Sequence, residues 1–149
     1  MSRPFISPIA IEELKVVNFE FKVNPKGPTG DLKMNLTLES PPAIVALDEE
    51  KGRYRSDVGL KVDVILSDDS DQRMSSSIQM IAAVTVPRDI GDEKKAGEYL
   101  KLNGVSMLYS HARTCFMTIA GLTPMANFIL PPIDPMAYIR SIAEQDELK

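Results

Sequence analysis

The chain has 149 residues, which suits one domain with its own hydrophobic core, since single domains usually span about 100 to 200 residues. The net charge of −4 and the pI near 5.0 exclude the clustered basic surface that nucleic-acid binding requires. A single cysteine excludes an intrachain disulfide framework and favours a reducing, cytoplasmic location, and no apolar run is long enough for membrane insertion.

The first part of the chain predicts an arm and two strands. Residues 1–12 include two prolines and are expected to form an extended arm. From Val17 to Val23 apolar and polar residues alternate, with Val17 in the apolar set, so this segment predicts a half-buried strand. A turn-forming segment then leads into a second alternation from Leu32 to Leu38, which the Pro41-Pro42 pair ends.

Residues 43–47 allow two interpretations. They are apolar, but the segment is short and lies between Pro42 and the acidic residues Asp48, Glu49 and Glu50. It either extends the second strand after a break or crosses the surface as a loop.

The next two alternations predict a hairpin. Apolar residues recur at every second position from Val58 to Leu66 and again within Met74–Val86, and the polar residues 67–72 between them have the composition of a turn. Pro87 then ends the sheet.

The remaining residues predict helices. A short helical piece is expected over Lys94–Leu100, interrupted by Asn103-Gly104, before a main helix that starts near Met107. Gly121 follows the last periodic residue, where glycine readily takes a left-handed cap conformation. After an apolar connector, Asp134 is placed to cap a C-terminal helix, and residues 144–149 are expected to form a flexible tail.

Strands followed by helices predict an α+β fold. We expect one domain over residues 1–149, with a four-stranded antiparallel sheet, one long helix and a shorter C-terminal helix packed on one face.

Two motifs resemble those of the SecB export chaperones. Residues 108–116 resemble the family signature Leu-Phe-Pro-Tyr-Ala-Arg-Glu-x-Ile, and residues 130–134 resemble its Leu-Pro-Pro-Val-Asn/Asp connector. The resemblance implies a SecB-like fold and a crossover loop near residues 43–47. The matching residues, to which a structural role is assigned, are Leu108, Ala112, Arg113, Gly121, Pro131 and Pro132. Arg113 is expected to need a partner, because an unpaired charge near a helix interface is costly.

The resemblance also implies a function. SecB chaperones are ATP-independent holdases that bind unfolded or precursor polypeptides in an apolar groove. The corresponding apolar residues here lie in two proline-bounded segments and the following helix: Ile44, Val45, Leu47, Met125, Phe128, Ile129, Leu130, Met136 and Ile139. Eight methionines suit an adaptable surface. The alternatives are that these residues close the protein's own core or an oligomer interface, and that the protein is a scaffold or an antitoxin-dedicated SecB-like chaperone.

The implied partners are an export ATPase and further copies of the chain. Family members are tetramers whose sheets join edge to edge, and the strand at Val17–Val23 would otherwise be an exposed edge. The family docks its ATPase through an acidic sheet face and a zinc-binding tail. Here the outward residues Asn18, Glu20 and Lys22 are mixed in charge and the tail has no Cys or His, which argues against coupling to export.

Catalysis and cofactors find little support in the sequence. His111 and Cys115 are four residues apart on one helix face, but no third orienting group accompanies them, so a structural role is favoured. One His and one Cys are too few ligands for zinc, and no phosphate-binding glycine motif occurs. We therefore expect a protein that is not an enzyme and has no cofactor or metal.

Overall fold

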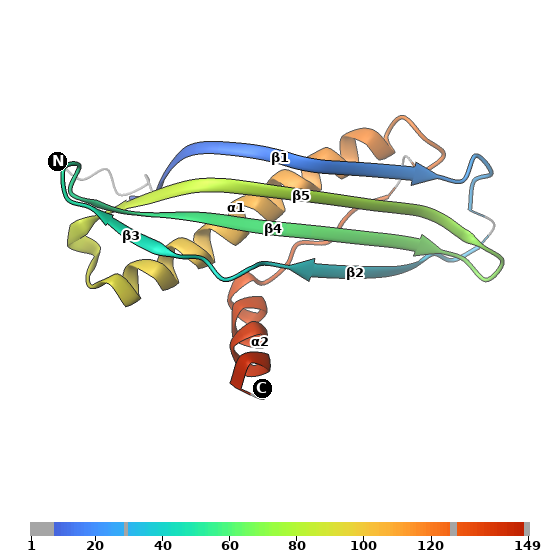
Figure 1. Cartoon of the computed structure of the whole chain (residues 1–149). Coiled ribbons are helices and arrows are strands. Elements are labelled where there is room, and N and C mark those ends of the chain that lie inside the picture. Colours follow the sequence, from blue (N-terminus) through green and yellow to red (C-terminus); the bar gives the residue numbers. More distant parts are fainter. Residues whose placement is uncertain (1–7, 29, 126–127, 148–149) are drawn as a thin grey trace.

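The fold is an antiparallel sheet covered by one long helix. The computed structural model describes residues 8–28, 30–125 and 128–147. The elements in chain order are β1 (Ala10–Val23), β2 (Lys33–Glu39), β3 (Val45–Asp48), β4 (Arg53–Ser67), β5 (Gln72–Pro87), a 3-10 turn (Arg88–Ile90), α1 (Glu93–Ala120) and α2 (Pro135–Glu147). The strand order is β1-β5-β4-β2, with β3 also paired to β4 (Figure 1). The predicted α+β class is confirmed.

The core lies between the two central strands and α1. Alternate residues of β4 and β5 point to the helix side and are buried, as period-two patterning requires. Val58 and Val62 on β4 and Ile78 on β5 are fully buried there, and Leu108 and Phe116 face them from α1. No helix in the described residues is long and apolar enough to cross a membrane.

The segment after β2 is a strand and not only a loop. Val45–Asp48 pairs with Ser56–Arg53 of β4 and continues the edge that β2 begins. Expecting a loop throughout residues 43–47 is therefore wrong, and extension of the edge after a break is correct. Val45 and Leu47 alternate towards the core, so pairing buries apolar surface that a loop would leave in water. The break is confined to residues 40–44, where Pro41 and Pro42 lack the N–H groups that a ladder needs.

The first strand is longer than predicted and carries β-bulges. It begins at Ala10, so residues 10–12 are not part of an arm, and residues 1–7 lie outside the described part. Val16 is opposite Met80 and Asn18 is opposite Gln79, which leaves Val17 as an extra residue. The prediction that Val17 faces inward is wrong, since its side chain is 63% exposed. Beyond the bulge, Phe19 packs against the core as predicted.

The long helix is continuous where an interruption was predicted. Asn103 and Gly104 lie inside α1, and the Asn103 amide donates a hydrogen bond to the Tyr99 carbonyl. A Cβ atom on Gly104 would lie 2.9 Å from Cγ2 of Val58, so the glycine allows the helix to approach β4 closely. Gly104 is therefore required for close packing and does not interrupt the helix.

The helix ends are determined by local chemistry. Asp92 caps α1 by accepting from the Lys95 N–H, and Asp134 caps α2 as predicted, accepting from Met136 and Ala137. Gly121 follows α1, but its φ of −60° is right-handed. The expectation of a left-handed cap there is wrong, and Pro124 is the next residue that cannot continue a helix.

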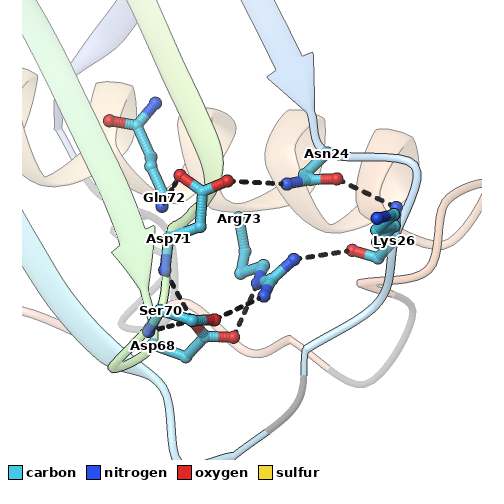
Figure 2. Close-up of polar contacts among 7 residues, drawn as sticks. All are labelled: Asn24, Lys26, Asp68, Ser70, Asp71, Gln72 and Arg73. Atoms are coloured by element: carbon cyan, nitrogen blue, oxygen red, sulfur yellow. Dashed lines mark hydrogen bonds and ion pairs between the residues drawn. The ribbon is translucent and has the colours of Figure 1, made fainter.

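A buried ion pair closes the β4–β5 hairpin (Figure 2). The Asp68 carboxylate lies 2.6 Å from Nε of Arg73, and the two side chains are 1% and 6% exposed. The same carboxylate accepts hydrogen bonds from the backbone N–H groups of Ser70 and Asp71, which shapes the turn. Arg73 also donates to the carbonyl of Lys26, so the pair joins this hairpin to the segment after β1.

We expect Asp68→Ala to lower the free energy of unfolding by about 3–5 kcal/mol, because removal of one partner leaves a buried, uncompensated arginine charge. Urea denaturation measures this change. The exposed neighbour provides the control, and Asp69→Ala should change stability by less than about 0.5 kcal/mol. Equal losses of stability from the two substitutions would show that the buried ion pair contributes no more to stability than an exposed carboxylate does.

We expect Gly104→Ala to destabilise the protein by about 1–3 kcal/mol, although alanine is the better helix former, because the added methyl overlaps Val58. The double variant Gly104→Ala/Val58→Ala tests the cause. It should lose less stability than the two single changes added together, since each change relieves the other. Additive losses of stability would mean that an added methyl group at residue 104 does not overlap Val58.

Candidate polypeptide-binding surface

The segment between β2 and β3 is held by a small polar cluster. Nζ of Lys101 on α1 donates to Oγ of Ser40 at 2.5 Å and to the Pro41 carbonyl at 2.6 Å. Oγ of Ser40 in turn donates to the Gly59 carbonyl of β4 at 2.6 Å. Burial lowers the pKa of Lys101. The cluster therefore ties α1 to the point where the sheet edge breaks.

The connector between the two helices runs back along α1. The Tyr109 hydroxyl donates to the Pro131 carbonyl, and Nε of Arg113 donates to the Leu130 carbonyl at 2.9 Å. The partner that Arg113 was expected to need is thus a backbone carbonyl. Burial raises the pKa of Tyr109, and the neighbouring Arg113 charge partly offsets this rise. These two contacts fix the path of the connector towards α2.

A groove of about 660 Å³ lies where α2 meets the broken edge of the sheet. Burial raises the pKa of Tyr138 on α2, the nearby Glu39 carboxylate raises it further, and a hydrogen bond with the Ser40 backbone lowers it. The residues that line the groove come from β1, the end of β2, the break, both central strands and α2, and include Val17, Pro41, Gly59, Ile81, Tyr138 and Ile142. In Figure 1, α2 extends beyond the β2 side of the sheet.

The residues predicted to bind polypeptide divide into three groups. Ile44, Ile129 and Met136 are exposed, by 86%, 67% and 49%. The half-buried side chains pack against the core and are those of Val45, Leu47, Phe128 and Ile139. Met125 and Leu130 are 3% and 0% exposed, so the expectation that they line an open surface is not met. Their segment closes the end of the core, where apolar burial is favourable.

The two proline-bounded segments are not adjacent. Val45 packs against Gly97 near the start of α1, whereas Leu130 is bound by Arg113 further along the same helix. At 1.5 Å per residue, these two positions on α1 are about 24 Å apart. Lys101, which holds the broken edge, lies between them. Ile44 and Ile129 therefore do not form one patch, and neither is among the residues that line the groove.

The floor of the groove was not predicted from the sequence. Ile81 of β5 lies on the outward face, where strand alternation places polar residues, and it is 41% exposed. An apolar residue at an outward position was the available signal. No local pattern indicates that Tyr138 reaches Ser40, because the two residues are far apart in the chain.

The described residues contain no assembled catalytic site. His111 and Cys115 are both half-buried on α1, and burial raises the pKa of the Cys115 thiol. A raised pKa disfavours the thiolate that nucleophilic catalysis needs. Within the described ranges, no group of three or more His, Cys, Asp or Glu side chains is placed to hold a metal ion.

Comparison with known proteins identifies the fold. No protein-family model and no curated protein matches the sequence. The chain is similar to the solved structure of the SecB-like chaperone Rv1957 of Mycobacterium tuberculosis in complex with a ChAD peptide from the HigA1 antitoxin, with 13% identity and a TM-score of 0.61 over 85% of this chain and 91% of that chain. A protein of unknown function from Streptococcus agalactiae matches with 6% identity and a TM-score of 0.42, over 85% of this chain and 96% of that one.

The chain therefore has a SecB-like fold, and the prediction of a divergent SecB-like protein is confirmed at the level of structure. The low identity explains why only short motifs resemble the family.

We expect Cys115 to react with iodoacetamide more slowly than free cysteine at pH 8, because its raised pKa leaves less thiolate at that pH. The rate should increase with pH and reach half its maximum above the pKa of a free thiol. Alkylation followed by mass spectrometry measures the rate. His111→Ala should not lower it, and a clear decrease would show that His111 activates the thiol.

Proposed function

We propose that this protein is an ATP-independent chaperone that holds non-native polypeptide on the groove between α2 and the broken edge of the sheet. The observation that carries the proposal is the apolar lining of that groove, which includes the exposed side chains of Val17 and Ile81, at 63% and 41%. Large apolar side chains exposed at this level typically mark interaction sites when they surround a concave surface.

The dimensions suit an extended client. The two positions on α1 that contact the proline-bounded segments are about 24 Å apart, which an extended chain of about 7 residues would span. Apolar client side chains buried there would each contribute through the hydrophobic effect, at about 25 cal/mol per Å² of surface removed from water. Affinity would then come from several modest contacts, as suits a protein that binds many sequences.

The free edge of β2 adds backbone recognition. In the described residues, Lys33–Glu39 pairs with β4 on one side and with no strand on the other. Unpaired N–H and C=O groups on such an edge can bind an extended segment whatever its side chains are. This supports binding of unfolded polypeptides in general.

A second candidate is a chaperone dedicated to one polypeptide, such as an antitoxin, without coupling to an export motor. The burial of Met125 and Leu130 favours it, because a smaller open surface restricts the range of clients. The similar structure from Mycobacterium tuberculosis was solved with an antitoxin peptide. On either candidate we place the protein in the cytoplasm.

The test is suppression of aggregation. A chemically denatured substrate is diluted with the purified protein and turbidity is followed. We expect suppression near equimolar ratios, and we expect Val17→Glu and Ile81→Glu each to weaken it at least about threefold, because a charge at these groove positions opposes burial of client side chains. Both side chains are exposed, so both variants should fold.

Leu122→Glu is the matched control, since Leu122 is 83% exposed but lies outside the groove. It should suppress aggregation as well as the unchanged protein does. Equal loss from all three substitutions would contradict a localised site. Failure with several unrelated substrates, combined with binding of one specific peptide, would favour the dedicated chaperone.

A further inference from the structure

One wall of the groove lies outside the strand pairing of the sheet. Ser40 and Pro41 line the groove and lie in the break between β2 and β3 (Figure 1). In the described residues, pairing with β4 stops at Glu39 and resumes at Val45. Pro41 has no N–H group, so it cannot donate to a ladder. The position of this wall therefore depends on hydrogen bonds made by side chains.

Lys101 provides two of these hydrogen bonds from α1. Its Nζ donates to Oγ of Ser40 at 2.5 Å and to the Pro41 carbonyl at 2.6 Å. The Ser40 hydroxyl donates its one proton to the Gly59 carbonyl, so its oxygen can only accept from Lys101. The wall thus presents two acceptors at one point, and an ammonium group has the donors for both.

We propose that Lys101 is a positioning residue for client binding, and that its charge holds the Ser40–Pro41 wall in place without contacting the client. Lys101 is not among the residues that line the groove. The inference rests on the proposed function, because it concerns the same groove. It adds that the affinity for a client depends on a residue behind the wall.

The other contacts of the wall come from residues that line the groove. A Cβ atom on Gly59 would lie 3.4 Å from Cγ of Pro41, so the proline ring packs directly on the glycine. Tyr138 of α2 is hydrogen-bonded to the Ser40 backbone. Gly59 and Tyr138 both line the groove, so a substitution of either would also change the surface that meets a client. A substitution of Lys101 changes the support of the wall and leaves that surface intact.

The charge of Lys101 is stabilised mainly by the wall itself. The side chain is half-buried, and burial lowers the pKa of its amino group. Among the described residues, no carboxylate forms an ion pair with it. Hydrogen bonds from a charged donor are about twice as strong as those from a neutral one. Loss of the charge would therefore weaken both contacts that hold the wall.

The affinity for a client tests this role in the full chain. The probe is a reduced and alkylated protein that stays unfolded, carries a fluorophore and is titrated by anisotropy. Lys101→Met keeps a long side chain without charge, and it should raise the dissociation constant about fivefold or more. Lys101→Arg retains the charge and several donors, so it should bind within about threefold of the unchanged protein.

Lys94→Met is the matched control. Lys94 is exposed, lies about two turns earlier on the same face of α1 and does not line the groove. Its substitution should leave the dissociation constant unchanged. Client binding that Lys101→Met leaves unaffected, or an equal loss in Lys101→Arg, would overturn the inference.

Hydrogen exchange separates this inference from the chaperone activity. Backbone amides of residues 38–47 are followed by mass spectrometry without client. Lys101→Met should speed their exchange at least about threefold, because the wall opens more often, whereas Lys101→Arg and Lys94→Met should not. Exchange within β5 should stay the same, and faster exchange there too would show a general loss of stability and overturn the inference. If the unchanged protein binds no client, the proposed function fails, and the exchange data alone decide whether Lys101 holds the wall.

Discussion

The close packing of α1 on the inner face of β4 is the constraint on which the rest of the structure depends. Gly104 allows the helix to reach Val58, and Gly97 does the same at Val45. Because α1 lies this near the sheet, Lys101 can reach the broken edge and Arg113 can hold the connector. The position of the broken edge, which forms one side of the groove, therefore depends on a helix position that two glycines allow.

The two edges of the sheet differ in length, in continuity and in the side chains that border them. The β2–β3 edge is interrupted by prolines, partly covered by α2 and bordered by exposed Ile44. The β1 edge is long, bulged, and alternates in charge on its outer face. A proline-broken edge suits transient binding of varied chains, whereas a long edge with patterned charge suits one specific partner.

The apolar connector has one side chain in the core and the next one exposed. Leu130 completes the core and its carbonyl is bound by Arg113, yet the adjacent Ile129 points to solvent. An extended backbone turns successive side chains to opposite sides, so one residue can stabilise the fold while the next remains available. An apolar, proline-rich segment can therefore complete the core and still leave an apolar side chain exposed.

The sequence by itself determined the α+β class, the β4–β5 hairpin, the cap at Asp134 and the SecB-like fold, because periodicity, capping and short motifs are local and are read from neighbouring residues. Only the tertiary structure decided that Gly104 lies within one helix, that Val45–Asp48 is a strand and that Val17 occupies a bulge. Each of these outcomes depends on a partner distant in the chain, Val58, Ser56 or Met80. Burial against such a partner outweighs local propensity, and no local pattern identifies it.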